Sequence, residues 1–156
     1  MNRYFAGIGS RETPDDILNI MANVSSSFTQ QGFFLRSGGA EGADKAFEKA
    51  SSGSVIYRPE DATPESIAMA ELYHPNWKLC SPYARLLLAR NCHIILGDDL
   101  KSPVEFVVCW TPGARLVGGT GHSLRLALKH KIKIYNLADQ VQYQELRIFY
   151  KSQAKP

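Results

Sequence analysis

The sequence predicts an α/β fold of three layers, in which helices cover both faces of a mostly parallel β-sheet. Stretches with strand composition alternate along the chain with stretches of helical periodicity, which is the order that βαβ units produce. Residues 104–110 form an apolar run broken only by Glu105, typical of a strand buried on both faces. With 156 residues, 44% hydrophobic and 21% charged, the chain is long and apolar enough for a single domain over residues 1–156.

The first half of the chain predicts three strands and two helices. The strands are expected at residues 4–8, 33–36 and 54–57. The first helix is expected to begin at Thr13 and Pro14, a capping residue followed by a proline of the first turn, and to end at Gly32. Each helix buries one face, made of Ile17, Ile20, Met21, Val24 and Phe28 in the first and of Ala43, Ala46, Phe47 and Ala50 in the second.

The second half predicts helices at residues 64–72 and 82–90, a strand at 104–110, a helix after residue 121, a strand at 132–137 and a final helix through Phe149. Residues 94–96 fit either a short strand or buried coil. Arg90 and Asn91 are expected to end their helix, where they either cap its C-terminus or reach toward a ligand. These elements complete the alternation of strands and helices.

Three glycine-bearing segments, at residues 7–11, 37–44 and 118–123, each connect a predicted strand to a predicted helix. In a parallel sheet, such segments gather at the carboxyl ends of the strands, where ligands bind. Glycine allows a phosphate to approach the backbone, and the N-terminus of the following helix offers free N–H groups. A tight turn is the simpler alternative for any one segment. Together, the three segments predict a pocket for a nucleotide or a phosphosugar.

Several kinds of protein are not expected from this sequence. The dinucleotide-binding pattern GxGxxG and the P-loop pattern GxxxxGK[ST] are both absent. The four histidines lack HxH or HxxxH spacing, so no metal site is expected. No cofactor is expected either. A net charge of +3 permits an anionic ligand, but a tight nucleic-acid binder usually shows a clustered basic stripe.

The sequence also predicts where the protein is found. No apolar run approaches the ~20 residues that a membrane span needs, and the N-terminal apolar stretch is too short for a secretory signal. The three cysteines, Cys80, Cys92 and Cys109, form no CxxC pattern and are expected to be reduced and mostly buried. These features indicate a cytoplasmic protein without a membrane partner.

Three motifs resemble the SLOG superfamily of Rossmann-like proteins: GIGSR at residues 7–11, SGGAEGAD at 37–44 and GGTGHSLRLA at 118–127. LARNCHIILG at 88–97 and FVVCWTP at 106–112 resemble that superfamily too. The resemblance covers residues 3–137 and is nearest to small DprA-like (Smf-like) or YpsA-like proteins, which phages often carry. It implies a Rossmann-like fold, a nucleotide or nucleotide-derived ligand at the glycine segments, and self-association as a homodimer.

The glycine segments and the resemblance together predict a set of ligand-binding residues: Gly9, Ser10, Arg11, Ser37, Gly38, Gly39, Gly42, Asp44, Gly118, Gly119, Thr120 and Ser123. Arg11 is expected to bind phosphate, with a solvated loop residue as the alternative. Asp44 either binds a ribose hydroxyl or caps its helix, and Thr120 and Ser123 either bind phosphate or cap theirs. His122 is expected to be solvated, with ligand contact as its alternative.

Two alternatives to simple ligand binding come from relatives within the superfamily. LOG phosphoribohydrolases cleave an N-glycosidic bond with the Glu of a PGGxGTxxE pattern. No Glu follows the glycines here, which leaves Glu41 and Asp44 as candidate catalytic carboxylates. DprA proteins bind single-stranded DNA in recombination, which needs a basic face, and the candidates for that face are Arg125, Lys129, His130, Lys131 and Lys133.

We therefore expect a binding protein rather than an enzyme. Its expected partner is a nucleotide or nucleotide-derived small molecule, with weak nucleic-acid binding at most. If the chain is phage-encoded, its location is the host cytoplasm.

Overall fold

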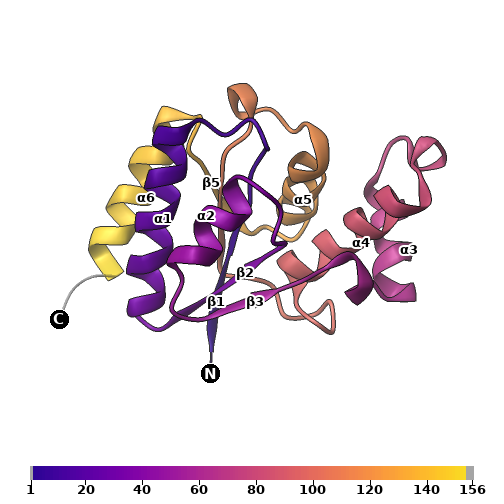
Figure 1. The fold of residues 1–156 in the computed structure, drawn as a ribbon, viewed down its shortest axis with the longest axis horizontal. Helices are drawn as coiled ribbons and strands as arrows, with labels where there is room; N and C mark the ends of the chain where they lie inside the picture. The colour runs from indigo at the N-terminus through magenta and orange to yellow at the C-terminus, as the bar shows by residue number, and fades with distance from the viewer. Residues whose placement is uncertain (1, 154–156) are drawn as a thin grey trace.

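The computed structural model of the protein describes residues 2–153 and has three layers, with a central sheet between two layers of helices (Figure 1). The strands are β1 (Arg3–Gly7), β2 (Phe33–Ser37), β3 (Ser54–Ile56), β4 (Phe106–Cys109) and β5 (Lys133–Asn136). The helices are α1 (Asp15–Gln30), α2 (Ala43–Ala50), α3 (Pro64–Tyr73), α4 (Pro82–Leu96), α5 (Gly118–Lys129) and α6 (Gln140–Gln153).

The sheet has the strand order β3-β2-β1-β4-β5, and every neighbouring pair is parallel. The chain moves outward from β1 to β3, then crosses back to place β4 on the other side of β1. Phe5 of β1 is in register with Leu35 of β2 and with Phe106 of β4. This arrangement confirms the predicted α/β fold, and it puts the carboxyl ends of all five strands at one edge.

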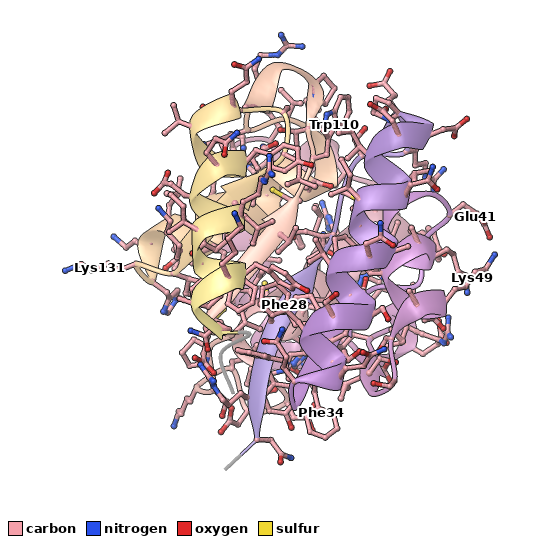
Figure 2. The ribbon with its side chains drawn as sticks, turned by 90° about the vertical axis from the view of Figure 1, so that its left-hand side faces the viewer. Phe28, Phe34, Glu41, Lys49, Trp110 and Lys131 are labelled. Carbon is pink, nitrogen blue, oxygen red and sulfur yellow. The ribbon has the colours of Figure 1, made fainter. Side chains whose placement is uncertain are left out.

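The two faces of the sheet bury different side chains. α1, α2 and α6 cover one face, where aromatic rings gather with centroids 5.0 to 6.4 Å apart: Phe5, Phe28, Phe33, Phe106 and Phe149. Figure 2 shows Phe28 where α1 and α6 approach each other. α3, α4 and α5 cover the other face with aliphatic side chains such as Ile95 and Leu124. The helix faces expected from the sequence for α1 and α2 are those that pack here.

Several predicted boundaries were wrong. α4 continues to Leu96, because residues 94–96 are buried on a helix rather than in a strand or coil. β4 is shorter than the apolar run predicted, since the N–H of Val104 donates to Ile95 O before the strand begins. Thr13 does not cap α1, since the N-cap is Pro14 and the Thr13 hydroxyl donates to Ser10 O at 2.5 Å.

The edge strand β5 has side-chain partners from α6. Gln142 Oε1 accepts a hydrogen bond from the backbone N–H of Asn136 at 2.9 Å, on the side of β5 that faces away from β4. Lys133 and Glu145 form an exposed ion pair at 2.6 Å. α6 is thereby tied both to the face of the sheet and to its edge.

All three cysteines are free, and Cys92 and Cys109 are buried. Burial raises the pKa of the Cys92 thiol to about 12 and raises that of Cys109 as well. Both thiols therefore stay protonated at neutral pH. Within residues 2–153, no helix combines the length and the apolar character that a membrane crossing requires.

Replacing Phe28 with alanine should lower the free energy of unfolding by about 3–5 kcal/mol, as expected when a buried aromatic side chain is removed. Phe28 is fully buried against the rings of Phe5, Phe106 and Phe149. Urea denaturation measures the loss. The exposed Val141→Ala is the control and should change stability by less than about 0.5 kcal/mol. An equally small effect of Phe28→Ala would contradict this account of the core.

Candidate functional site

The candidate site lies at the carboxyl ends of β1, β2 and β3. Two glycines at the end of β1 allow α2 to pack closely against this strand. A Cβ atom added at Gly7 would lie 2.5 Å from the ring of Phe47, and one at Gly9 would lie 2.6 Å from the Cβ of Ala43. Both partners belong to α2, so α2 packs directly on the end of β1. The predicted ligand residue Gly9 thus has a packing role, which holds the loop before α2 beside Ser10.

The second glycine segment forms a tight loop between β2 and α2. Gly39 and Gly42 have φ values of +72° and +91°, which favour glycine over residues with a side chain. The hydroxyl of Ser37 is buried and donates to Gly7 O at 2.6 Å, so the fold itself uses this predicted ligand group. Gly42 is the N-cap of α2, which excludes the capping role predicted for Asp44.

Asp44 instead lies under the loop that precedes its helix. Its Oδ2 accepts a hydrogen bond from the N–H of Ala40 at 3.2 Å, and the residue is only 6% exposed. Burial raises the pKa of this carboxyl to about 6, although the Ala40 amide and the charge of Arg90 act in the opposite direction. Asp44 is therefore a carboxyl group that titrates close to neutral pH.

Arg90 of α4 joins the ends of two strands to this loop. Its Nη1 donates to Gly38 O at 2.6 Å and to Tyr57 O at 2.9 Å, and its Nε donates to Asn91 Oδ1 at 3.0 Å. The prediction that Arg90 caps a helix C-terminus was wrong, because α4 continues for six residues beyond it. The alternative, that Arg90 reaches toward a ligand, stays a prediction, and the contact with Gly38 O brings Arg90 to the second glycine segment. Burial lowers the pKa of this guanidinium.

The third glycine segment is not a loop. Gly118 begins α5, with Val117 as an N-cap that makes no side-chain hydrogen bond, so neither Thr120 nor Ser123 caps this helix. Gly118 and Gly119 are exposed, and Gly119 O accepts a hydrogen bond from Asn91 Nδ2 at 3.3 Å. The Arg90–Asn91 pair thus connects the second glycine segment with the first turn of α5.

Two residues of this helix face inward. Ser123 is buried and donates to Gly119 O at 3.4 Å. His122 is 1% exposed, with Nε2 at 3.2 Å from Ala70 O of α3, and burial lowers its pKa. The expectation of a solvated His122 was wrong, because a loop was predicted where a helix turns this side chain toward α3.

Exposed side chains surround the second glycine segment. The guanidinium of Arg58 approaches Gly39, with Nη1 3.2 Å from where a Cβ would stand, and the backbone of Arg11 passes beside Gly42. Neither arginine side chain forms a hydrogen bond or an ion pair with any residue from 2 to 153. Glu41 projects outward from the same loop (Figure 2), and the Ser10 hydroxyl accepts from the N–H of Glu12.

Three arginines therefore come from three parts of the chain to one glycine loop. Arg90 holds the loop through Gly38 O, the Arg58 guanidinium approaches Gly39, and the backbone of the exposed Arg11 passes beside Gly42. Guanidinium groups bind phosphate through paired hydrogen bonds, so this arrangement suits a phosphate-bearing ligand. Between residues 2 and 153, no three His, Cys, Asp or Glu side chains gather as they would around a metal ion.

The fold and the glycine segments at its edge define the class of the protein as Rossmann-like α/β. A solved structure with a similar fold is that of DNA processing protein A from Helicobacter pylori, described for its mode of binding single-stranded DNA. It matches with a TM-score of 0.60 and 22% sequence identity, over 98% of this chain and 74% of that one. At this identity, the match shows a shared fold. No protein-family model and no curated protein matches the sequence.

The buried Asp44 should make stability depend on pH. Because its pKa is higher in the folded state than in the unfolded chain, the folded state binds more protons between about pH 4 and pH 6. Ionisation over this range therefore costs stability, on the order of 2–3 kcal/mol. Asp44→Asn keeps an acceptor for the Ala40 amide but cannot ionise. Its stability relative to the parent should rise by that amount from pH 4 to pH 7.

Urea denaturation of both proteins across this pH range measures the difference. A stability difference that stays constant with pH would show that Asp44 titrates normally. Arg90→Met serves as a second variant. It removes a charge that favours the carboxylate, so it should raise the pKa of Asp44 further, which NMR titration of the carboxyl can follow.

Proposed function

We propose that the chain, as one domain over residues 1–156, binds single-stranded nucleic acid along the carboxyl edge of its sheet. Residues 1 and 154–156 lie outside the part that the structure describes. The observation that carries this proposal is the pair of exposed, unengaged arginines beside the loop that Arg90 holds, with the Arg58 guanidinium near Gly39 and the backbone of Arg11 near Gly42. The fold shared with a protein described as binding single-stranded DNA supports the same function.

The proposed contact is to phosphates rather than to bases. Arg11 and Arg58 are both exposed, so each can bind a phosphate without giving up a partner within the fold. Neutralising few phosphates gives modest affinity that falls with added salt. This agrees with the net charge of +3, which is small for a tight nucleic-acid binder.

A mononucleotide is the second candidate ligand, and the first turn of α5 favours it. Gly118 and Gly119 are exposed, and no side chain caps the N-terminus of this helix. A terminal phosphate carries more charge than a phosphodiester and suits the free N–H groups of a helix N-terminus. The nucleotide hypothesis from the sequence therefore involves Gly118 to Thr120 more than the hydroxyls of Ser37 and Ser123.

The other hypotheses from the sequence stay predictions. N-glycosidic cleavage would depend on Glu41, which is exposed, or on Asp44, whose carboxylate accepts from the Ala40 amide. A cytoplasmic location, a phage origin and self-association as a homodimer are likewise expectations from the sequence.

Replacing both arginines should weaken oligonucleotide binding. Fluorescence anisotropy with a labelled oligothymidylate measures the affinity at several salt concentrations. The double variant Arg11→Met, Arg58→Met should bind at least about tenfold more weakly at low salt, because two phosphate contacts are lost. Each single change should reduce the slope of log affinity against log salt by about 0.7. Lys151→Met, an exposed charge removed from α6, is the matched control and should leave the slope unchanged.

Other outcomes distinguish the alternatives. Equal affinity of the double variant and the parent would contradict the proposal. Loss of binding only on neutralising Lys129, Lys131 and Lys133 would move the interface to the far end of α5 and the start of β5. If a nucleoside monophosphate raises the melting temperature while the oligonucleotide does not bind, the mononucleotide is the ligand.

A further inference from the structure

A cavity of about 320 Å³ lies on the α4 side of the sheet, and no residue of the three glycine segments lines it. Strands β1, β2 and β3 form its floor, and the segment that joins α4 to β4 closes one side. This volume is at the lower end of the range for small-molecule sites. The nucleic-acid proposal uses neither the cavity nor its charged side chains.

Arg36 of β2 supplies the positive charge of this cavity. The residue is only 5% exposed, and its guanidinium carbon lies 4.0 Å from the ring centre of Tyr4. Nη1 donates to Ser102 O at 2.6 Å, whereas Nε is buried without a hydrogen-bond partner. No carboxylate within residues 2–153 lies close enough to form an ion pair with Arg36. Because a buried charge is costly without a counter-ion, this guanidinium is suited to an incoming anion.

Two exposed carboxylates lie at the rim of the same cavity. Asp98 accepts a hydrogen bond from the Tyr57 hydroxyl at 2.6 Å. Asp99 accepts from the N–H of Lys101 at 2.9 Å and from the Ser102 hydroxyl at 3.0 Å, and these bonds lower its pKa. Neither forms an ion pair with a cation in the described part of the chain. The rim is therefore suited to a cationic group.

We infer that this cavity binds a small zwitterion of the α-amino acid class. The ligand carboxylate pairs with the positive charge of the Arg36 guanidinium, and the ligand ammonium faces Asp98 and Asp99. Tyr4 and Val55 provide apolar surface for the carbon atoms between and beyond these groups. The site thus combines one buried positive charge with two exposed negative charges.

A ligand with a single charge fits this arrangement less well. A simple anion such as inorganic phosphate would satisfy Arg36 but would meet repulsion from Asp98 and Asp99. A simple amine would pair with the aspartates and leave Arg36 without a counter-ion. An α-amino acid carries both charges on neighbouring atoms, so it can satisfy both ends of the cavity at once.

Thermal denaturation with each common amino acid at millimolar concentration tests the inference, followed by calorimetric titration of those that raise the melting temperature. At least one amino acid should bind. Arg36→Met and Asp98→Asn should each weaken its binding by about tenfold or more, since each removes a charge–charge contact. Asp98→Asn keeps an acceptor for the Tyr57 hydroxyl and lies at an exposed position, so it tests the site even if Arg36→Met does not fold.

Lys49→Met, at the exposed end of α2, is the control and should bind the amino acid as the parent does. The deaminated and decarboxylated analogues of the best amino acid should each bind at least about tenfold more weakly. Failure of every amino acid to bind would overturn the inference. So would equal binding to the Arg36→Met variant, or equal binding of the deaminated acid, because a zwitterion would then not be required.

Discussion

The close packing of α2 against the end of β1 is the constraint on which the carboxyl edge depends. Gly7 and Gly9 leave no space for a side chain, because Phe47 and Ala43 of α2 occupy the positions where a Cβ would stand. The loop before α2 therefore lies between the ends of β1 and β3. Arg90 donates a hydrogen bond to this loop, and Arg58 and the backbone of Arg11 lie beside it. A larger residue at either glycine would displace helix, loop and site together.

The fold could be predicted because its signals are local and repeated, whereas some boundaries depend on tertiary contacts. β4 was recognisable as an apolar run within a chain that alternates strands and helices. Residues 94–96 were ambiguous, because a short buried run fits a strand or a helix equally well. Residues 118–121 contain three glycines, which are poor helix formers, yet they form the first turn of α5. The packing of Gly121 against Leu116 accompanies this turn and has no local signature.

The candidate site was predictable in its location and less so in its members. Glycines after strands placed it at the carboxyl edge. The sequence left Arg90 open between a helix cap and a ligand contact, because its partners Gly38 and Tyr57 lie more than thirty residues earlier in the chain. Arg58 was overlooked, although it follows the third predicted strand almost directly, as Arg11 follows the first. An arginine that closely follows a predicted strand is therefore a sequence signal for this site, and it applies to both Arg11 and Arg58.

The hydrogen bond from the backbone N–H of Asn136 to the Gln142 side chain affects whether another chain can pair with the edge of the sheet. An edge strand with open backbone groups is a template on which another chain can add a strand and begin aggregation. On β5, the Gln142 side chain occupies one of these groups, and on the opposite edge β3 is only three residues long. Neither edge strand therefore offers a long, open row of backbone groups to another chain. Both features make it harder for another chain to add a strand to this sheet.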